Sequence, residues 1–210
     1  MTYSVKEIFK TLQGEGAQTG RVAVFCRFAG CNLWSGREED RASSDCTFCD
    51  TDFVGTDGDN GGKFAFASDL ADAICQKWGK DTKRRFVVFT GGEPLLQLDA
   101  KLLAEMHLRH FNVAVETNGT IEPPDGIDWL CVSPKAGTKL AVRHGHELKL
   151  VFPQQNVNPT DFESLSFEHF WLQPMDGINK EANTTAVITF CLEHPRWRLS
   201  LQTHKLIGMP

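Results

Sequence analysis

Three cysteines in the first quarter of the chain have the residue type and spacing of ligands for a metal ion or a metal cluster. Fourteen residues separate Cys31 from Cys46, and two residues separate Cys46 from Cys49. A C-x-x-C pair suits chelation because the tight turn between the thiols brings both sulfurs within reach of one centre. A closed structural zinc site requires a fourth protein ligand, whereas an iron–sulfur cluster held by three thiolates leaves one iron open. The spacing alone leaves both kinds of site open.

Cys26 is the nearest candidate for a fourth ligand. It lies in the run 21–28, whose apolar residues point to both sides and predict a strand that is covered on two faces. Cys26 shares its alternating face with Val22 and Val24, which is more typical of a packed core thiol than of a ligand. The alternative, from a different class of protein, is a zinc-stabilised binding module that uses Cys26 together with the three cysteines above.

Arg27 places a charge inside the same apolar run. A guanidinium in such a strand needs an anionic or hydrogen-bonding partner, because an unpaired buried charge is costly. The residues around it leave two interpretations open: an ion pair within the protein, and a contact with the carboxylate of a substrate.

The remainder of the chain alternates short β-rich runs with few helices. About seven strands are predicted, with helices at 68–80, after the Gly91-Gly92 turn and at 180–192, while the first segment, 5–16, is expected to run into a loop. This alternation indicates an α/β fold, a reduced, partial (β/α) barrel of about six parallel strands with few outer helices. Parallel strands gather their carboxyl ends at one mouth of a barrel, where active sites lie. The polar residues expected there are Thr90 with Gly91 and Gly92, Glu116, Ser133 with Lys135, Gln173 with Asp176, and Thr203 with His204.

Length, charge and composition narrow the class of protein. The chain has 210 residues, of which 41% are hydrophobic, and this is enough for one buried core, so we predict a single domain over 1–210. The net charge of −5 argues against a nucleic-acid partner, which would need a basic face. We find no signal peptide and no apolar run near the roughly 20 residues that cross a membrane, and therefore expect no membrane partner and a cytoplasmic location. The seven cysteines are expected as ligands and core thiols rather than as disulfides.

The segments around the cysteine trio give it a context. With Phe48 before the last thiol and TGGEP (90–94) after a strand, the trio resembles the radical S-adenosylmethionine (SAM) superfamily, whose usual spacing is C-x3-C-x-aromatic-C. Fourteen residues here replace the usual three, so 32–45 is expected to be an insertion inside the cluster-binding loop. The flanking segments resemble one family within that superfamily, the 7-carboxy-7-deazaguanine synthases. These segments are EIFKTLQGEG (7–16), FCRFAGCNLW (25–34), FCDTDF (48–53), ETNGT (116–120), VSPK (132–135), LQPMDG (172–177) and QTHKLIG (202–208).

The resemblance implies a carbon–nitrogen lyase with a radical SAM core that uses a [4Fe–4S] cluster, SAM and Mg²⁺. In this family the open iron binds the amino and carboxylate groups of SAM, and one electron releases a 5′-deoxyadenosyl radical. The radical takes a hydrogen from C6 of 6-carboxy-5,6,7,8-tetrahydropterin, the ring contracts, ammonia leaves and 7-carboxy-7-deazaguanine forms, a 7-deazapurine precursor of 7-cyano-7-deazaguanine (preQ0) and queuosine. Another radical SAM enzyme, such as a glycyl-radical activase, is the alternative among enzymes.

The resemblance also implies roles for single residues. Cys31, Cys46 and Cys49 are expected to ligate the cluster and Thr51 to ligate Mg²⁺. Arg27 is expected to bind the substrate carboxylate, which favours that interpretation over the ion pair. The residues expected to bind SAM are Phe48, Cys49, Asp50, Gly92, Glu116, Ser133, Pro134, Lys135, Gln173, Pro174, Met175 and Asp176. The residues expected to bind the substrate are Leu12, Gln13, Gly14, Glu15, Arg27, Thr90, Lys149, His204 and Pro210.

The same resemblance implies two protein partners. A flavodoxin-type electron donor is expected to reduce the cluster. A second copy of the chain is expected in a homodimer, because few outer helices would leave apolar barrel surface to cover.

Overall fold

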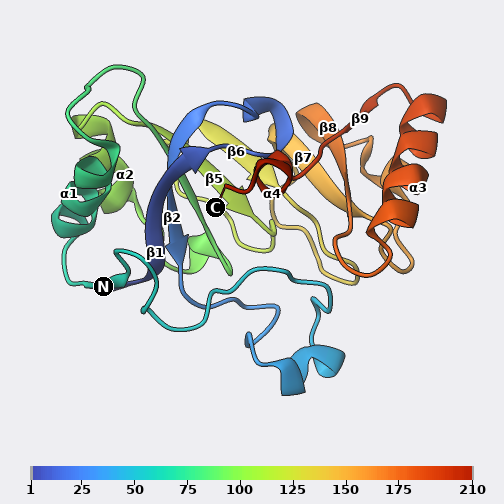
Figure 1. Cartoon of the computed structure of the whole chain (residues 1–210), viewed down its shortest axis with the longest axis horizontal. Helices are drawn as coiled ribbons and strands as arrows, with labels where there is room; N and C mark the ends of the chain where they lie inside the picture. The colour runs from blue at the N-terminus through green and yellow to red at the C-terminus, as the bar shows by residue number, and fades with distance from the viewer. Residues whose placement is uncertain (1, 210) are drawn as a thin grey trace.

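One open sheet organises the protein, as the computed structural model of residues 2–209 shows (Figure 1). Within these residues the sheet has nine strands in the order β3-β1-β2-β4-β5-β6-β7-β8-β9. The strands from β2 to β9 in this order run parallel, whereas β1 pairs antiparallel with both β2 and β3. The strands are β1 (Tyr3–Leu12), β2 (Val22–Phe28), β3 (Gly62–Phe64), β4 (Phe86–Gly91), β5 (Asn112–Thr117), β6 (Trp129–Val132), β7 (His144–Phe152), β8 (Ser166–Pro174) and β9 (Trp197–Leu199).

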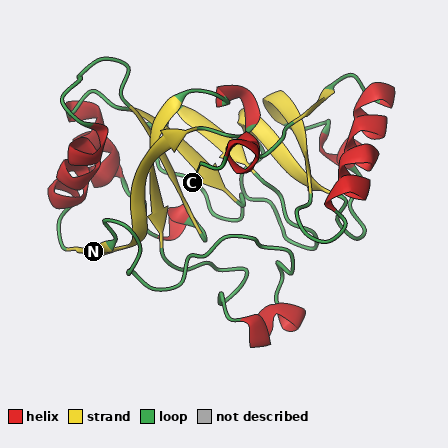
Figure 2. Cartoon of the chain, in the orientation of Figure 1, coloured by secondary structure: helices red, strands yellow, loops and turns green. Residues whose placement is uncertain are grey.

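The helices lie mainly at the two ends of the sheet (Figure 2). α1 packs against β1 and β2, α2 against β5, and α3 against β8 and β9, which seals the outer face there. The helices are α1 (Ala67–Trp78), α2 (Ala100–Leu108), α3 (Lys180–Glu193) and the short α4 (Thr203–Ile207). The 3₁₀ helices are η1 (Gly16–Gln18), η2 (Glu38–Ser43), η3 (Pro94–Leu96) and η4 (Pro159–Phe162). Within residues 2–209 no helix combines the length and the apolar character needed to cross a bilayer.

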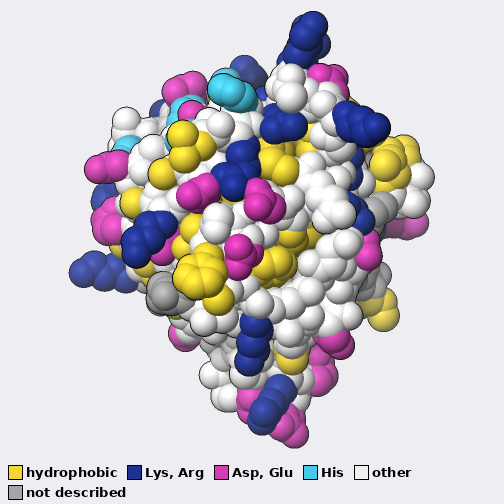
Figure 3. All heavy atoms as spheres, turned by 90° about the vertical axis from the view of Figure 1, so that its left-hand side faces the viewer, with side chains coloured by type: hydrophobic (Ala, Val, Ile, Leu, Met, Phe, Trp, Pro, Cys, Tyr) yellow, Lys and Arg dark blue, Asp and Glu magenta, His cyan; other side chains and the backbone are white. Residues whose placement is uncertain are grey.

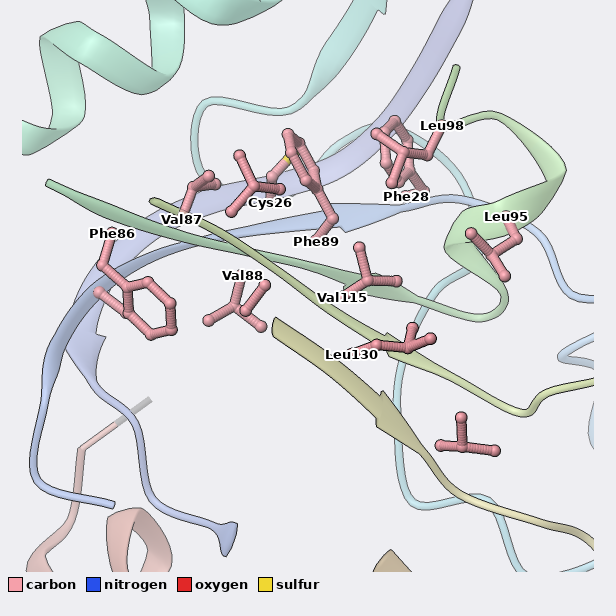
Figure 4. Packing of buried hydrophobic residues seen from close by; sticks show 14 of the residues in the cluster. Cys26, Phe28, Phe86, Val87, Val88, Phe89, Leu95, Leu98, Val115 and Leu130 are labelled. Carbon is pink, nitrogen blue, oxygen red and sulfur yellow. The ribbon is translucent and has the colours of Figure 1, made fainter. Parts of the chain in front are cut away.

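Strand register separates a core face from a polar face. Cys26 pairs with Phe89 and Phe89 with Val115, and all three side chains are fully buried on the outer face. Figure 4 shows the Cys26 sulfur among apolar side chains, close to Phe89. Residues one step along the strands point the other way, because side chains alternate with a period of two. Arg27 pairs with Thr90 on this inner face.

The predicted architecture is confirmed in its essentials. The fold is α/β with an open, mostly parallel sheet of the partial-barrel type, and the predicted helices at 68–80 and 180–192 form as α1 and α3. Seven strands of the described chain run parallel, one more than expected, and the sheet ends at β3 and β9 without closing. All seven cysteines are free thiols, and Cys26 is a core thiol, as its spacing indicates.

The first segment differs from expectation, because residues 3–12 form β1 rather than running into a loop. Its inner-face residues Glu7, Phe9 and Thr11 mix a charge, an aromatic ring and a hydroxyl, so the segment lacks the simple apolar alternation of a strand. Antiparallel pairing with β2 places these three side chains in register with the inner face of that strand.

Candidate active site

A cavity of about 360 Å³ lies on the inner face of the sheet, at the carboxyl ends of the parallel strands. It is closed by the loop after β2, the loop after β1 and α4. Residues far apart in the sequence therefore meet there. The predicted site residues that line it are Leu12, Gln13, Gly14, Glu15, Arg27, Cys31, Cys46, Phe48, Cys49, Asp50, Thr51, Thr90, Gly92, Glu116, Ser133, Lys135, Lys149, Gln173, Pro174, Met175, Asp176 and His204.

Two predicted residues are not part of this set. Pro134 is buried and lines a neighbouring cavity behind the loop that carries Ser133 and Lys135. Pro210 lies outside the described residues.

The two ends of the fourteen-residue segment between Cys31 and Cys46 are joined by backbone hydrogen bonds. The backbone N–H groups of Asp45 and Cys46 both donate to the carbonyl of Leu33, at 3.1 and 3.3 Å. The chain thus leaves the loop after Leu33 and returns to it at Cys46. Cys46 therefore lies beside Leu33, which is two residues after Cys31. Residues 32–45 therefore leave the loop and return to it, and the three thiols line one cavity.

The thiols differ in their electrostatic environment. Cys46 is buried, while Cys31 and Cys49 are half-buried. A hydrogen bond from the Cys46 thiol lowers the pKa of Cys49 to about 6, and the same bond, with burial, raises the pKa of Cys46. Burial also raises the pKa of Cys31, although the N–H of Leu33 donates to its sulfur at 3.4 Å. The pair Cys46–Cys49 therefore favours one thiolate, the species that binds metals.

The donor set fits a cluster that several thiolates share. Within residues 2–209 no three His, Cys, Asp or Glu side chains meet closely enough to hold a single metal ion. Iron–sulfur clusters are held by cysteine thiolates, and three soft sulfur donors on one cavity wall suit that chemistry.

The glycine turn after β4 packs directly on the loop that carries Cys31. A Cβ on Gly92 would lie 2.2 Å from the carbonyl oxygen of Gly30 and 2.7 Å from Cβ of Cys31. The next residue, Glu93, donates its N–H to Gly30 O at 3.0 Å. Only glycine permits this approach.

We expect Gly92→Ala to displace Cys31 and lower cluster content by about tenfold after anaerobic reconstitution, as disturbed supports of metal ligands do. Iron and acid-labile sulfide per chain are the measurement. Gly137→Ala is the control, because a Cβ there would meet no atom within 4 Å, so this variant carries only the backbone strain of a positive φ (75°) and no clash with the loop of Cys31. Equal cluster content in the two variants would contradict the prediction.

Glu93 anchors the same turn to the end of β5. Its buried carboxylate accepts hydrogen bonds from the N–H of Leu95 at 2.9 Å, the hydroxyl of Thr117 at 2.8 Å and the N–H of Asn118 at 2.8 Å. Burial raises the pKa of this carboxyl group despite the three donors. Asn118 in turn donates to the side chain of Asn32 at 3.0 Å, so the start of the insertion is tied to the same network.

Lys149 is a buried cation between two carboxylates. Its ammonium contacts Glu15 directly and lies 3.3 Å from Oε2 of Glu116. Gln13 donates to Glu116 at 2.9 Å, and Gln173 donates to Glu15 at 3.1 Å. The predicted substrate and cofactor residues thus form one hydrogen-bonded network, in which Glu116 lies with the substrate group.

The charges of this network depend on one another. Burial alone would raise the pKa of Glu15, but the Lys149 ammonium outweighs it and holds this pKa below its ordinary value. Burial alone would lower the pKa of Lys149, and the carboxylates of Glu116 and Glu15 reverse that effect. These charged side chains line the cavity but are mostly buried, so water screens them little.

Arg27 has a partner within the protein. Its Nε donates to Oε1 of Glu7 at 2.7 Å, with both side chains partly exposed on the cavity wall. The ion pair, one of the two interpretations left open by the sequence, therefore exists. The terminal nitrogens of a guanidinium remain able to bind a further carboxylate, because Arg has five N–H donors.

The C-terminal segment is bound across the loop after β1. The N–H and the hydroxyl of Thr203 both donate to the carbonyl of Gly14, at 3.0 and 2.8 Å. A Cβ on Gly14 would lie 2.1 Å from Nδ1 of His204, so glycine is needed where α4 crosses. His204 thereby lines the cavity.

Lys205 joins three segments at the cavity rim. Its ammonium lies 2.7 Å from Asp50 and 2.6 Å from Asp176, and Gln202 donates to the same oxygen of Asp50 at 3.2 Å. The Lys205 hydrogen bond holds the pKa of Asp176 at about 2. The loop that carries Asp50, the segment after β8 and α4 are thereby held together.

Lys135 faces the aromatic residue of the cysteine motif. It donates to the hydroxyl and the carbonyl of Ser133, both at 2.7 Å, and its ammonium lies 5.9 Å from the ring centroid of Phe48. Burial lowers the pKa of Lys135.

Several cavity residues escaped the sequence analysis. Glu7, Phe9 and Thr11 belong to β1, whose pattern did not indicate a strand, and Gln202 and Lys205 lie in the QTHK motif, where only Thr203 and His204 were singled out. For Gln202 and Lys205 the motif itself was a sufficient signal. The others are Phe25, Leu33, Asp52, Thr117, Asn118 and Val151, whereas Gly91, which also lines the cavity, was expected at the barrel mouth.

Comparison with known proteins gives a consistent result. A scan against protein-family models found no match. The 7-carboxy-7-deazaguanine synthase of Bordetella pertussis is 67% identical over 210 residues, and that of Caulobacter vibrioides is 63% identical, each match covering 100% of both chains. The crystal structure of QueE from Escherichia coli superposes with a TM-score of 0.68 at 26% identity, covering 96% of this chain and 94% of that one.

Proposed function

Since the chain belongs to the 7-carboxy-7-deazaguanine synthase family, radical SAM lyases of the queuosine pathway, we propose that it converts 6-carboxy-5,6,7,8-tetrahydropterin to 7-carboxy-7-deazaguanine and ammonia. One observation carries the proposal. Residues from all the segments that resemble the family line a single cavity, although they are spread from β1 to α4. Such convergence is the usual mark of an active site at the carboxyl ends of parallel strands.

The cofactor side of the cavity is the cluster loop and the strand ends beside it. We assign Cys31, Cys46 and Cys49 to a [4Fe–4S] cluster, and the donor set described above supports this. When bound, the cluster and SAM supply the radical that takes a hydrogen atom from the substrate. The SAM residues are proposed to be Phe48, Cys49, Asp50, Gly92, Ser133, Pro134, Lys135, Gln173, Pro174, Met175 and Asp176.

Each of these groups has a physical task. Gly92 lines the cavity without a side chain, so its backbone suits a close approach by the methionine amino group of SAM. The Phe48 ring and the backbone next to it suit stacking and hydrogen bonding with a flat base. Lys135, held by Ser133, offers a positive charge near the cluster loop, which favours carboxylates and thiolates there.

The substrate side is the network around Lys149. Gln13 and Glu15 present an amide and a carboxylate to the donor and acceptor edge of a pterin. Arg27 offers its free guanidinium nitrogens to the substrate carboxylate, with Glu7 holding the other edge of the guanidinium. Glu116 is assigned to the substrate or to the orientation of SAM, and the remaining contacts are proposed to be Leu12, Gly14, Thr90, His204 and Pro210.

Thr51 is proposed to ligate Mg²⁺, with the substrate carboxylate and water supplying further oxygens. We expect Thr51→Ala to raise the Mg²⁺ concentration for half-maximal turnover by about tenfold, as loss of one ligand-supporting group does. Thr47→Ala is the matched control, because Thr47 lies in the same loop but outside the cavity. Identical Mg²⁺ titrations of the two variants would remove the metal role of Thr51.

The setting of the enzyme is also a proposal. We propose a single catalytic domain over 1–210, with 32–45 as an insertion, that acts in the cytoplasm on a small molecule. A flavodoxin-type donor would supply the electron, and two copies would form a homodimer. Sedimentation at several concentrations tests the dimer, and reduction by purified flavodoxin tests the donor.

Anaerobic turnover is the experiment that tests the function. The protein is reconstituted with iron and sulfide and mixed with reductant, SAM, Mg²⁺ and the carboxytetrahydropterin. We expect a brown protein that forms 5′-deoxyadenosine, ammonia and 7-carboxy-7-deazaguanine. A colourless protein with one tightly bound zinc ion would overturn the proposal and favour the binding module, and 5′-deoxyadenosine without the deazapurine would favour a different radical SAM enzyme.

A further inference from the structure

One side chain of the insertion reaches back to the turn that carries two of the thiols. The insertion projects from the lower end of the molecule, where both signs of charge are exposed (Figures 1 and 3). Arg41 lies in its 3₁₀ helix η2. The Nη1 atom of Arg41 donates to the backbone carbonyls of Thr47 and Cys49, each at 3.1 Å. A single guanidinium nitrogen therefore spans the turn from one side of Phe48 to the other.

The guanidinium is fixed by its surroundings on the remaining sides. Its central carbon lies 4.0 Å from the ring centroid of Trp34, close enough for stacking. The Trp34 ring is itself held, because its edge packs on Phe53 at 5.5 Å and 89° and its Nε1 donates to the carbonyl of Arg37 at 3.0 Å. A planar cation on a fixed ring has few other orientations available.

The ion pair of Arg41 does not account for this arrangement. Glu38 accepts from Nε of Arg41 at 2.6 Å, but the Glu38 side chain is 77% exposed, against 25% for Arg41. Exposed ion pairs contribute little to stability because water screens them. Hydrogen bonds from a charged donor to main-chain carbonyls are stronger and more directional.

A second contact joins the end of η2 to the same turn. The hydroxyl of Ser44 lies 2.7 Å from the carbonyl of Arg41 and 2.9 Å from the carbonyl of Cys46. The insertion thus contacts the backbone at Cys46, Thr47 and Cys49, and Arg41 makes two of these three contacts.

We propose that Arg41 is a positioning residue that holds the turn 46–49 in the conformation in which both thiols face the cavity. One consequence of this inference, the retention of the cluster by these thiols, rests on the proposed function. The insertion 32–45 then has a defined role, which is to stabilise the turn 46–49 from within the same loop. The shorter C-x3-C spacing of the superfamily leaves no room for such a helix.

Arg41→Gln, Arg41→Lys and Arg37→Gln are compared with the parent protein. Arg37 is the matched control, because it lies in the same insertion, is 72% exposed and has only a loose partner in Glu39 at 3.9 Å. Hydrogen exchange of the peptide 44–52 is measured in the apoprotein, and the rate of iron loss to a chelator is measured after reconstitution. Thermal melting of each apoprotein checks that the rest of the fold is unchanged.

We expect Arg41→Gln to accelerate both exchange and iron loss by about tenfold, with an unchanged melting temperature, and Arg37→Gln to match the parent. Arg41→Lys keeps the charge but cannot stack flat while spanning two carbonyls, so its rates should lie between those of the parent and Arg41→Gln.

Two results would overturn the inference. Exchange and iron loss of Arg41→Gln equal to those of Arg37→Gln would show that the contacts do not hold the turn. A parent-like Arg41→Lys would show that charge alone acts. A parent protein that binds no iron would refute the proposed cluster, while the exchange rates of the apoprotein would still test the role of Arg41.

Discussion

Replacing Cys46 with alanine is expected to abolish cluster binding and turnover while leaving the protein folded. Cys46 is a small buried side chain, so truncation to alanine costs only about 1 kcal/mol of packing. Its loss removes one of three proposed ligands and also the hydrogen bond that lowers the pKa of Cys49. The measurements are iron and sulfide per chain, the visible spectrum and the yield of 5′-deoxyadenosine.

Cys26→Ala is the control that separates the two kinds of metal site. Its thiol packs against apolar side chains on the opposite face of the sheet (Figure 4). We expect this variant to melt at a slightly lower temperature and to keep its cluster. Loss of metal from Cys26→Ala, or full cluster content in Cys46→Ala, would contradict the assignment of ligands.

Lys149→Met is expected to destabilise the protein strongly and to stop turnover. The substitution keeps a chain of similar length but leaves Glu15 and Glu116 without their cation in a buried site. Removing one partner of a buried ion pair costs about 3 to 5 kcal/mol. We expect a melting temperature roughly 10 °C lower at pH 7. Lys101→Met, at an exposed position of α2, should change little.

The dependence on pH distinguishes this effect from a simple packing loss. In the parent, the lowered pKa of Glu15 adds stability that is present above its ordinary pKa and is lost as pH falls through the lower folded value. Without Lys149, burial is the main remaining influence on the pKa of Glu15, so this pKa rises in the folded protein. Protonation of Glu15 then removes the cost of burying an unpaired carboxylate. The difference in stability between parent and variant should therefore narrow as pH falls from about 7 toward about 4.3.

A second substitution tests the same explanation at neutral pH. Glu15→Gln in the Lys149→Met background removes one uncompensated carboxylate, and we expect it to restore part of the lost stability. A double variant no more stable than Lys149→Met, together with a gap between parent and variant that is constant with pH, would attribute the effect to packing alone.

The strand ends were predictable because their pattern is local. Runs such as 112–117 are apolar along the strand and polar where they end, so both the strand β5 and the placement of Glu116 follow from nearby residues. The thiol of Cys26 could likewise be separated from the ligands, because Val24 and Val22, two and four residues before it, share its alternating face.

The path of the fourteen residues between Cys31 and Cys46 could not be predicted from local sequence pattern. Nothing in the residues 32–45 indicates that Asp45 and Cys46 return to the carbonyl of Leu33, since this closure depends on main-chain groups that every sequence possesses. The hydrogen bonds from Arg41 to the turn 46–49 could not be predicted either, because a charged residue in a polar loop is typical of a solvated surface.

The sequence by itself determined the α/β class, the three thiols, the polar strand ends and the family resemblance, because all of these rest on residue type and short-range spacing. Tertiary structure alone decided which partners these groups have. It paired Arg27 with Glu7, enclosed Lys149 between Glu15 and Glu116, and added β1 to the cavity wall. The physical reason is that burial and long-range pairing set the energy of a charge, and neither is encoded in its immediate neighbours along the chain.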